Sequence, residues 1–67
     1  MDENLRGTDE VYFVIAGMTS FGGSFVKALG EALRHADEMN TTKIKETFPE
    51  YWKQYLEMGK KAERREE

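Results

Sequence analysis

The sequence contains no cysteine, one proline and a single histidine among its 67 residues. The absence of cysteine excludes disulfides and thiolate metal sites as sources of stability. His35 alone cannot form a zinc site, because such sites take three or four protein ligands. A chain of about 60 residues buries only about 60% of its unfolded surface. This one contains eight aromatic residues, a large number for so small a core to bury. We therefore predict that the protein is a homo-oligomer.

Basic residues do not outnumber acidic ones, since 10 Lys and Arg face 13 Asp and Glu. Neither end of the chain is a basic arm, which disfavours nucleic acid as a partner. The longest apolar run, residues 11–18, is too short to span a bilayer, so we expect no membrane partner. This run follows an acidic segment, unlike the apolar core of a signal peptide. We therefore expect a cytoplasmic location.

The apolar pattern predicts an all-α fold, a small bundle of about three helices completed by homo-oligomerisation. From Gly22 onward, apolar residues recur at three- and four-residue steps, which is typical of a helix with one buried face. Breaks are predicted near Gly22, Asn40 and Pro49, with Asn40 or Thr41 capping the segment that follows. Residues 11–16 are ambiguous, because their β-branched and aromatic content also suits a strand completed between subunits. We favour a helix there, since no other segment of the chain indicates a pairing strand.

The chain is expected to form one domain with two polar ends. Residues 1–8 lack periodicity and predict a flexible acidic N-terminus, with Thr8 suited to cap the first helix. Residues 9–59 form the predicted helical domain. Residues 60–67 have no apolar face, and we interpret them as a charged helix end or tail.

Three blocks of sequence, "GGSFVKAL", "HADEMN" and "KIKETFPEYWKQY", resemble a group of small, mostly uncharacterised bacteriophage and prophage proteins. The resemblance covers about residues 18–56 and does not include the N-terminal segment. It implies a phage accessory protein that acts in the bacterial cytoplasm, with host defence as its target. It implies no catalytic residue.

The turn "SFGGS" before the second predicted helix allows two interpretations. Backbone N–H groups at a glycine-rich helix start suit an anion, and the hydroxyls of Ser20 and Ser24 would add donors. The spacing matches neither a P-loop nor a dinucleotide-binding fingerprint. Alternatively, Gly22 and Gly23 permit a kink or a close helix crossing, since Gly23 and Gly30 lie seven residues apart. We favour packing over ligand contact.

Aromatic and cationic side chains supply the remaining candidates for a binding site. Trp52 is predicted to be a core residue, whereas Tyr51 and Tyr55 could stack on a base or anchor a subunit interface. Lys27 and Arg34 lie on one cationic stripe, and Arg34 could bind a phosphate at a symmetric interface. The complete candidate ligand-binding set is Ser20, Phe21, Gly22, Gly23, Ser24, Lys27, Arg34, Tyr51 and Tyr55.

No catalytic constellation or metal motif is found, so we predict a binding protein and not an enzyme, without a cofactor. The leading hypothesis is a counter-defence protein whose subunit interfaces sequester a nucleotide-type host immune signal. The alternative is a protein–protein inhibitor or adaptor that covers a host defence protein with exposed aromatic side chains.

Overall fold

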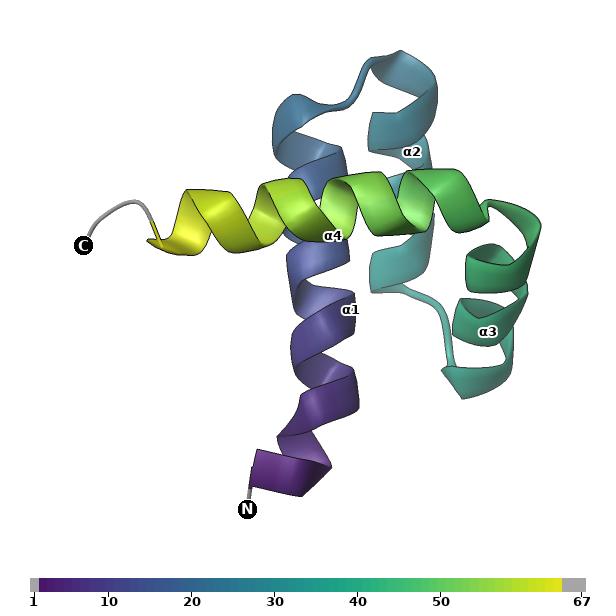
Figure 1. Ribbon diagram of the computed structural model, residues 1–67. Coiled ribbons are helices and arrows are strands. Elements are labelled where there is room, and N and C mark those ends of the chain that lie inside the picture. Colours follow the sequence, from purple (N-terminus) through teal and green to yellow (C-terminus); the bar gives the residue numbers. More distant parts are fainter. Residues whose placement is uncertain (1, 65–67) are drawn as a thin grey trace.

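The computed structural model describes the backbone of residues 2–64 and the side chains of residues 10–62. Within this part the protein contains no strand and consists of four helices, α1 (Asp2–Phe21), α2 (Ser24–Arg34), α3 (Glu38–Thr47) and α4 (Pro49–Arg64). In Figure 1, α2 returns beside α1, and α4 lies across α1. The predicted all-α class is confirmed, with four helices in place of about three.

Helix α1 is longer than the sequence pattern predicts. Residues 2–8, expected to precede the first helix, form its first turns, so the helix does not begin at Thr8. The ambiguous residues 11–16 are helical, and the strand alternative is wrong. A helix that is apolar on several sides can contact more than one neighbour, and α1 packs against both α2 and α4. The C-terminal segment is helical as far as Arg64, and residues 65–67 lie outside the described residues.

Two of the three helix breaks lie where the sequence predicts them, and the third does not. The chain leaves helical geometry at Gly22–Gly23 and again at Phe48, directly before Pro49. The remaining break is at residues 35–37, and the predicted stop at Asn40 is wrong because Asn40 lies inside α3. The cause is Asp37, whose carboxylate accepts a hydrogen bond of 2.9 Å from the Asn40 N–H and caps the helix.

The core lies where α1, α2 and α4 meet. Its buried side chains are Val14 and Met18 of α1, Val26 and Leu33 of α2, and Trp52 and Tyr55 of α4. Trp52 is only 4% exposed, which confirms that it is a core residue. Helix α3 contributes no fully buried residue. It reaches the core through Ile44, which is half-buried against these side chains.

Glycines allow the helices to approach closely at two places. Where α4 crosses α1, a Cβ added at Gly17 would collide with the backbone carbonyl of Tyr55, and one added at Gly59 with that of Phe13. Where α2 meets α1, a Cβ at Gly30 would lie 2.9 Å from Met18 Cβ. Backbone therefore packs directly against backbone at the α1–α4 crossing, which side chains larger than hydrogen would prevent. Among the described residues, no helix is both long and apolar enough to cross a membrane.

Candidate functional site

The Gly22–Gly23 turn does not form the close helix crossing expected at Gly23. A Cβ added at Gly23 would meet no atom within 4 Å, because the residue faces open space. Gly22 is confined locally, since a Cβ there would lie 2.5 Å from Val26 Cγ1, and its N–H donates to Met18 O at 3.0 Å. The packing interpretation is thus wrong for Gly23, and Gly17, Gly30 and Gly59 make the interhelical contacts in its place.

The start of α2 keeps a feature that suits an anion. Gly23 is the N-cap residue and provides no side-chain hydrogen bond, and the first turn of α2 contains no acidic residue. Ser24 and Lys27 are both exposed beside this end of the helix. The positive end of the helix dipole is therefore not neutralised by a side chain of its own first turn.

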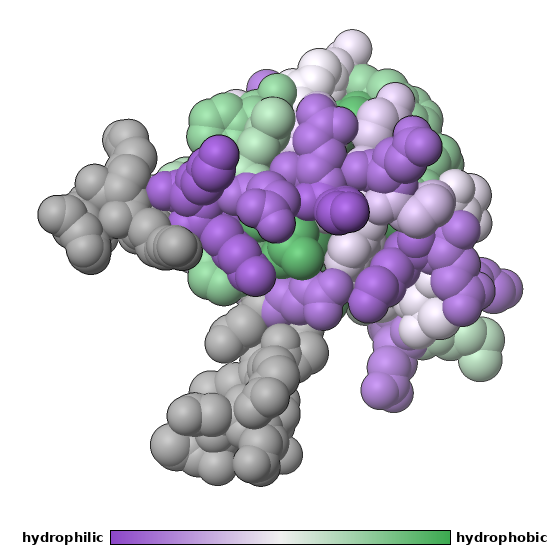
Figure 2. All heavy atoms as spheres, viewed as in Figure 1, coloured by the Kyte–Doolittle hydropathy of each residue, from purple (hydrophilic) through white to green (hydrophobic). Residues whose placement is uncertain are grey.

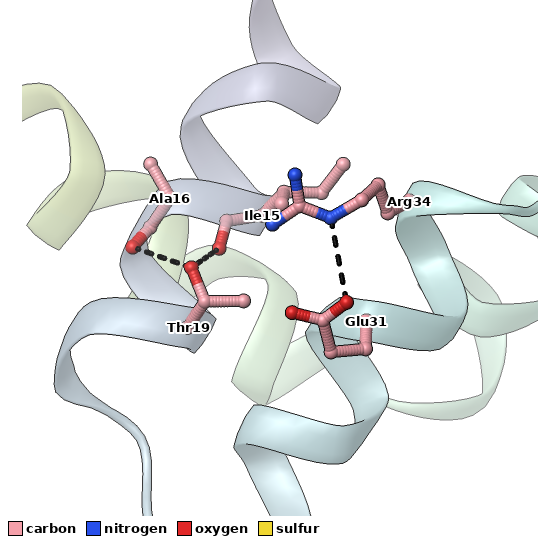
Figure 3. A network of polar contacts seen from close by, with 5 residues as sticks. All are labelled: Ile15, Ala16, Thr19, Glu31 and Arg34. Carbon is pink, nitrogen blue, oxygen red and sulfur yellow. Dashed lines mark hydrogen bonds and ion pairs between the residues drawn. The ribbon is translucent and has the colours of Figure 1, made fainter.

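Arg34 lies at the opposite end of α2 from this turn. An 11-residue helix is about 16 Å long, so the backbones of Arg34 and Gly23 lie at opposite ends of α2. The guanidinium Nε lies 3.5 Å from Glu31 Oε1 in an exposed ion pair (Figure 3). Thr19 in the same view turns its hydroxyl to Ile15 O at 2.8 Å, within α1. The cationic stripe is thus an ordinary solvated face with one internal pair.

The two candidate tyrosines have different environments. Tyr55 is 8% exposed and belongs to the core, so its ring is not available to stack on a ligand. Tyr51 is half-buried, and its ring is stacked on Phe48 with a centroid distance of 5.9 Å. Only Tyr51 remains a candidate for surface contact.

Phe25, Phe48 and Tyr51 gather on one surface, which we call the aromatic surface. The Phe25 ring lies 6.0 Å from that of Phe48 and 6.3 Å from that of Tyr51, and Phe25 is 59% exposed. Phe25 and Phe48 are not among the residues predicted from the sequence, because the helical period places Phe25 on the apolar face and Phe48 is expected in the core. The ring is exposed because Phe25 lies in the first turn of α2, at the edge of the core.

A second exposed apolar site lies on the other side of the Gly22–Gly23 turn. Phe21, the last residue of α1, is 54% exposed. With Met58, Lys61 and Ala62 of α4 it lines a hollow of about 550 Å³. Figure 2 shows hydrophilic side chains gathered over the near face of α4, with hydrophobic surface at its margins. Phe21 and Phe25 thus expose apolar surface just before and just after the turn, and Ser20 and Ser24 are exposed there as well.

Glu10, Lys45 and Trp52 form a polar cluster that joins three helices. The indole Nε1–H of Trp52 donates to Glu10 Oε2 at 2.7 Å, and Lys45 Nζ lies 3.2 Å from the same oxygen. The ammonium group also lies 5.5 Å from the centre of the Trp52 ring. The indole N–H is thereby satisfied inside the core, and α3 is tied to α1 through one carboxylate.

The hydrogen bond from Trp52 lowers the pKa of the Glu10 carboxyl from its ordinary value, and Lys45 and Lys60 lower it further against the opposing effect of burial. A lowered folded-state pKa stabilises the fold at pH values above that of the unfolded carboxyl. This contribution is lost as the pH falls through the folded-state pKa. We therefore expect acid to weaken wild type more than Glu10→Gln, which has no carboxyl to titrate at this position.

Melting curves of both proteins between pH 7 and pH 3 would measure this effect. The difference in melting temperature should shrink as the pH falls below the ordinary pKa of a glutamate carboxyl, about 4.3, toward the lowered folded-state pKa. The variant Glu38→Gln removes an exposed carboxylate of α3 and provides the matched control. A constant difference across the pH range would contradict the assignment to Glu10.

No protein-family model matches the chain, and comparisons with curated proteins and with solved structures find no match. Among the described residues, no group of three or more His, Cys, Asp or Glu side chains could hold a metal ion. Of the sequence-predicted set, Ser20, Phe21, Gly23 and Ser24 are exposed together at one turn, whereas Tyr55 and Arg34 lie elsewhere.

Proposed function

We propose that this protein is a non-enzymatic binding protein that associates with a second copy of itself through the aromatic surface. The observation that carries the proposal is the position of Phe25, which is 59% exposed while it contacts Phe48 and Tyr51. A single exposed apolar residue is common on proteins, but a cluster of aromatic rings at the surface is typical of an interface.

Self-association supplies apolar burial that one protomer lacks. Only six hydrophobic residues form the buried core of the described chain, whereas Phe21 and Phe25 remain more than half exposed. Fully burying one such side chain contributes roughly 1.5–3 kcal/mol. A two-fold symmetric interface uses the same surface on both copies, so each exposed residue contributes two buried side chains to the dimer. The second copy is therefore the partner that the exposed rings favour.

A nucleotide-type signal bound between such copies is the more specific form of the proposal. It is favoured by the start of α2, where the residue directly after Ser24 is the exposed Phe25 and the first turn has no acidic side chain. A phosphate could bind the backbone N–H groups at the start of α2, and a base could stack on the Phe25 ring. In a phage context the ligand would be a host immune signal. The alternative partner, a host defence protein covered by the same aromatic surface, remains an outcome of the test.

Replacing Phe25 with serine is expected to shift the protein from oligomer to monomer while its helical circular dichroism is retained. The variant removes the most exposed ring of the aromatic surface, whereas the six buried core residues stay intact. Light scattering at micromolar concentration measures the oligomeric state. Native mass spectrometry of protein purified from bacterial cells would show a retained nucleotide as additional mass on the oligomer.

Met39→Ser is the matched control, because Met39 is exposed and apolar but lies on α3, outside the aromatic surface. It should leave the oligomer unchanged. A wild-type protein that is monomeric and binds only a host protein would support the adaptor function and refute self-association. An oligomer unaffected by Phe25→Ser would show that the copies meet elsewhere.

A further inference from the structure

Helix α3 makes few contacts with the other helices among the side chains of residues 10–62. None of its residues is fully buried, in contrast to α2, which buries Val26, Gly30 and Leu33. The Asn40 N–H donates to the capping carboxylate of Asp37, and the Thr42 hydroxyl donates to Glu38 O, so both hydrogen bonds lie within the segment 37–42. These interactions shape α3 but do not attach it to its neighbours.

Among the side chains that the structure describes, one apolar residue and one ion pair attach α3 to other helices. Ile44 packs half-buried against the core. Lys45 Nζ lies 3.2 Å from Glu10 Oε2 of α1 and over the ring of Trp52 of α4. Non-helical residues flank the segment on both sides, at 35–37 and at Phe48. Elements with little buried apolar surface are the ones that open locally.

We infer that α3 is a lid, which opens while α1, α2 and α4 stay packed, and that the Glu10–Lys45 ion pair is its latch. Helices shorter than about 12 residues are marginal when isolated in water. The 10 residues of α3 therefore unwind when they detach. Opening is thus a local transition from helix to coil between two fixed joints.

The lid forms one wall of a hollow of about 670 Å³. Thr42, Lys45 and Glu46 line it from α3, and Glu10 lines it from α1. Pro49, Trp52, Lys53 and Leu56 line it from α4. When α3 detaches, this wall is lost and the ring of Trp52 loses the cover that Lys45 provides. Among the described side chains, the charged groups around the latch carboxylate are Lys45 and Lys60, with Glu46 and Lys53 in the same hollow. Access to Trp52 therefore depends on one partly exposed ion pair, which salt weakens.

Native-state hydrogen exchange, measured by NMR at increasing urea below the unfolding transition, tests this inference on the whole chain. We expect the amides of residues 41–47 to exchange faster than those of Val14 and Met18. Their rates should barely change with urea, because local opening exposes little surface. The rates at Val14 and Met18 should rise steeply, since they require global unfolding.

Lys45→Met removes the latch and should speed exchange at residues 41–47 by roughly two- to fivefold, as expected for a partly exposed ion pair. Lys43→Met, an exposed lysine of the same helix, is the matched control and should leave these rates unchanged. Equal urea slopes for α3 and for Val14 and Met18 would show that α3 opens only with the whole molecule, which would overturn the lid. Unchanged α3 rates in Lys45→Met would overturn the latch.

Discussion

Replacing Gly59 with alanine is expected to lower the free energy of unfolding by roughly 3 kcal/mol, the upper end of the usual cost of overpacking. The added Cβ would collide with the backbone carbonyl of Phe13, at the point where α4 crosses α1. A carbonyl within a helix cannot move aside without its helix, so the two helices must separate. Alanine favours a helix over glycine by about 1 kcal/mol, which offsets only part of the loss.

Thermal melting followed by far-UV circular dichroism measures this effect. For a domain of this size each kcal/mol shifts the melting temperature by about 4–8 °C. Gly23→Ala is the matched control, because its added methyl group would meet no atom within 4 Å. It changes only the cap of α2, and we expect it to cost less than about 1 kcal/mol. A Gly59→Ala variant that melts at or above the wild-type temperature would contradict the close crossing.

Gly17 makes the reciprocal contact, which sharpens the test. Its Cβ would collide with the carbonyl of Tyr55 and lie 3.2 Å from the Gly59 nitrogen. Once the methyl group of one variant has separated the helices, the second methyl group fits with less overpacking. The double variant Gly17→Ala/Gly59→Ala should therefore cost less than the sum of the single variants. Additive losses would indicate two independent sites.

The contrast between Gly23 and Gly59 shows which parts of the fold can be predicted from the sequence. Helical periodicity predicted the all-α class, and steps of three and four residues put Gly59 on the same side of α4 as Trp52 and Tyr55. It could not show which glycine faces another helix, because that depends on where α4 crosses α1. Likewise, the Asn40 stop was wrong because a second capping residue, Asp37, lies close by and accepts the actual bond.

The candidate site was less predictable than the fold. The exposed turn from Ser20 to Ser24 follows from local sequence, since paired glycines interrupt a helix and flanking serines stay polar. The Glu10–Trp52 hydrogen bond joins residues 42 positions apart, and no local pattern indicates such a contact. Tyr51 and Tyr55, four positions apart on one helix, differ in burial because only Tyr55 reaches the core.

Replacing Trp52 with alanine is expected to abolish cooperative unfolding. Removing a buried aromatic side chain costs about 3–5 kcal/mol, and Trp52 is 4% exposed within the core. At 0.05–0.15 kcal/mol per residue, a chain of this length has a total stability of roughly 3–10 kcal/mol. The loss is thus comparable to the whole stability of the fold. Far-UV circular dichroism during heating measures it.

Trp52→Phe separates the ring from the hydrogen bond. It keeps most of the buried aromatic surface but removes the indole N–H that donates to Glu10 at 2.7 Å. A hydrogen bond to a charged group contributes about 1.5–3 kcal/mol, and we expect the lower end because the Glu10 side chain is partly exposed and also pairs with Lys45. Trp52→Phe should therefore melt cooperatively at a reduced temperature. A Trp52→Ala protein that melted cooperatively near the wild-type temperature would show that the indole is not a core side chain, and its ring would then become a candidate for ligand contact.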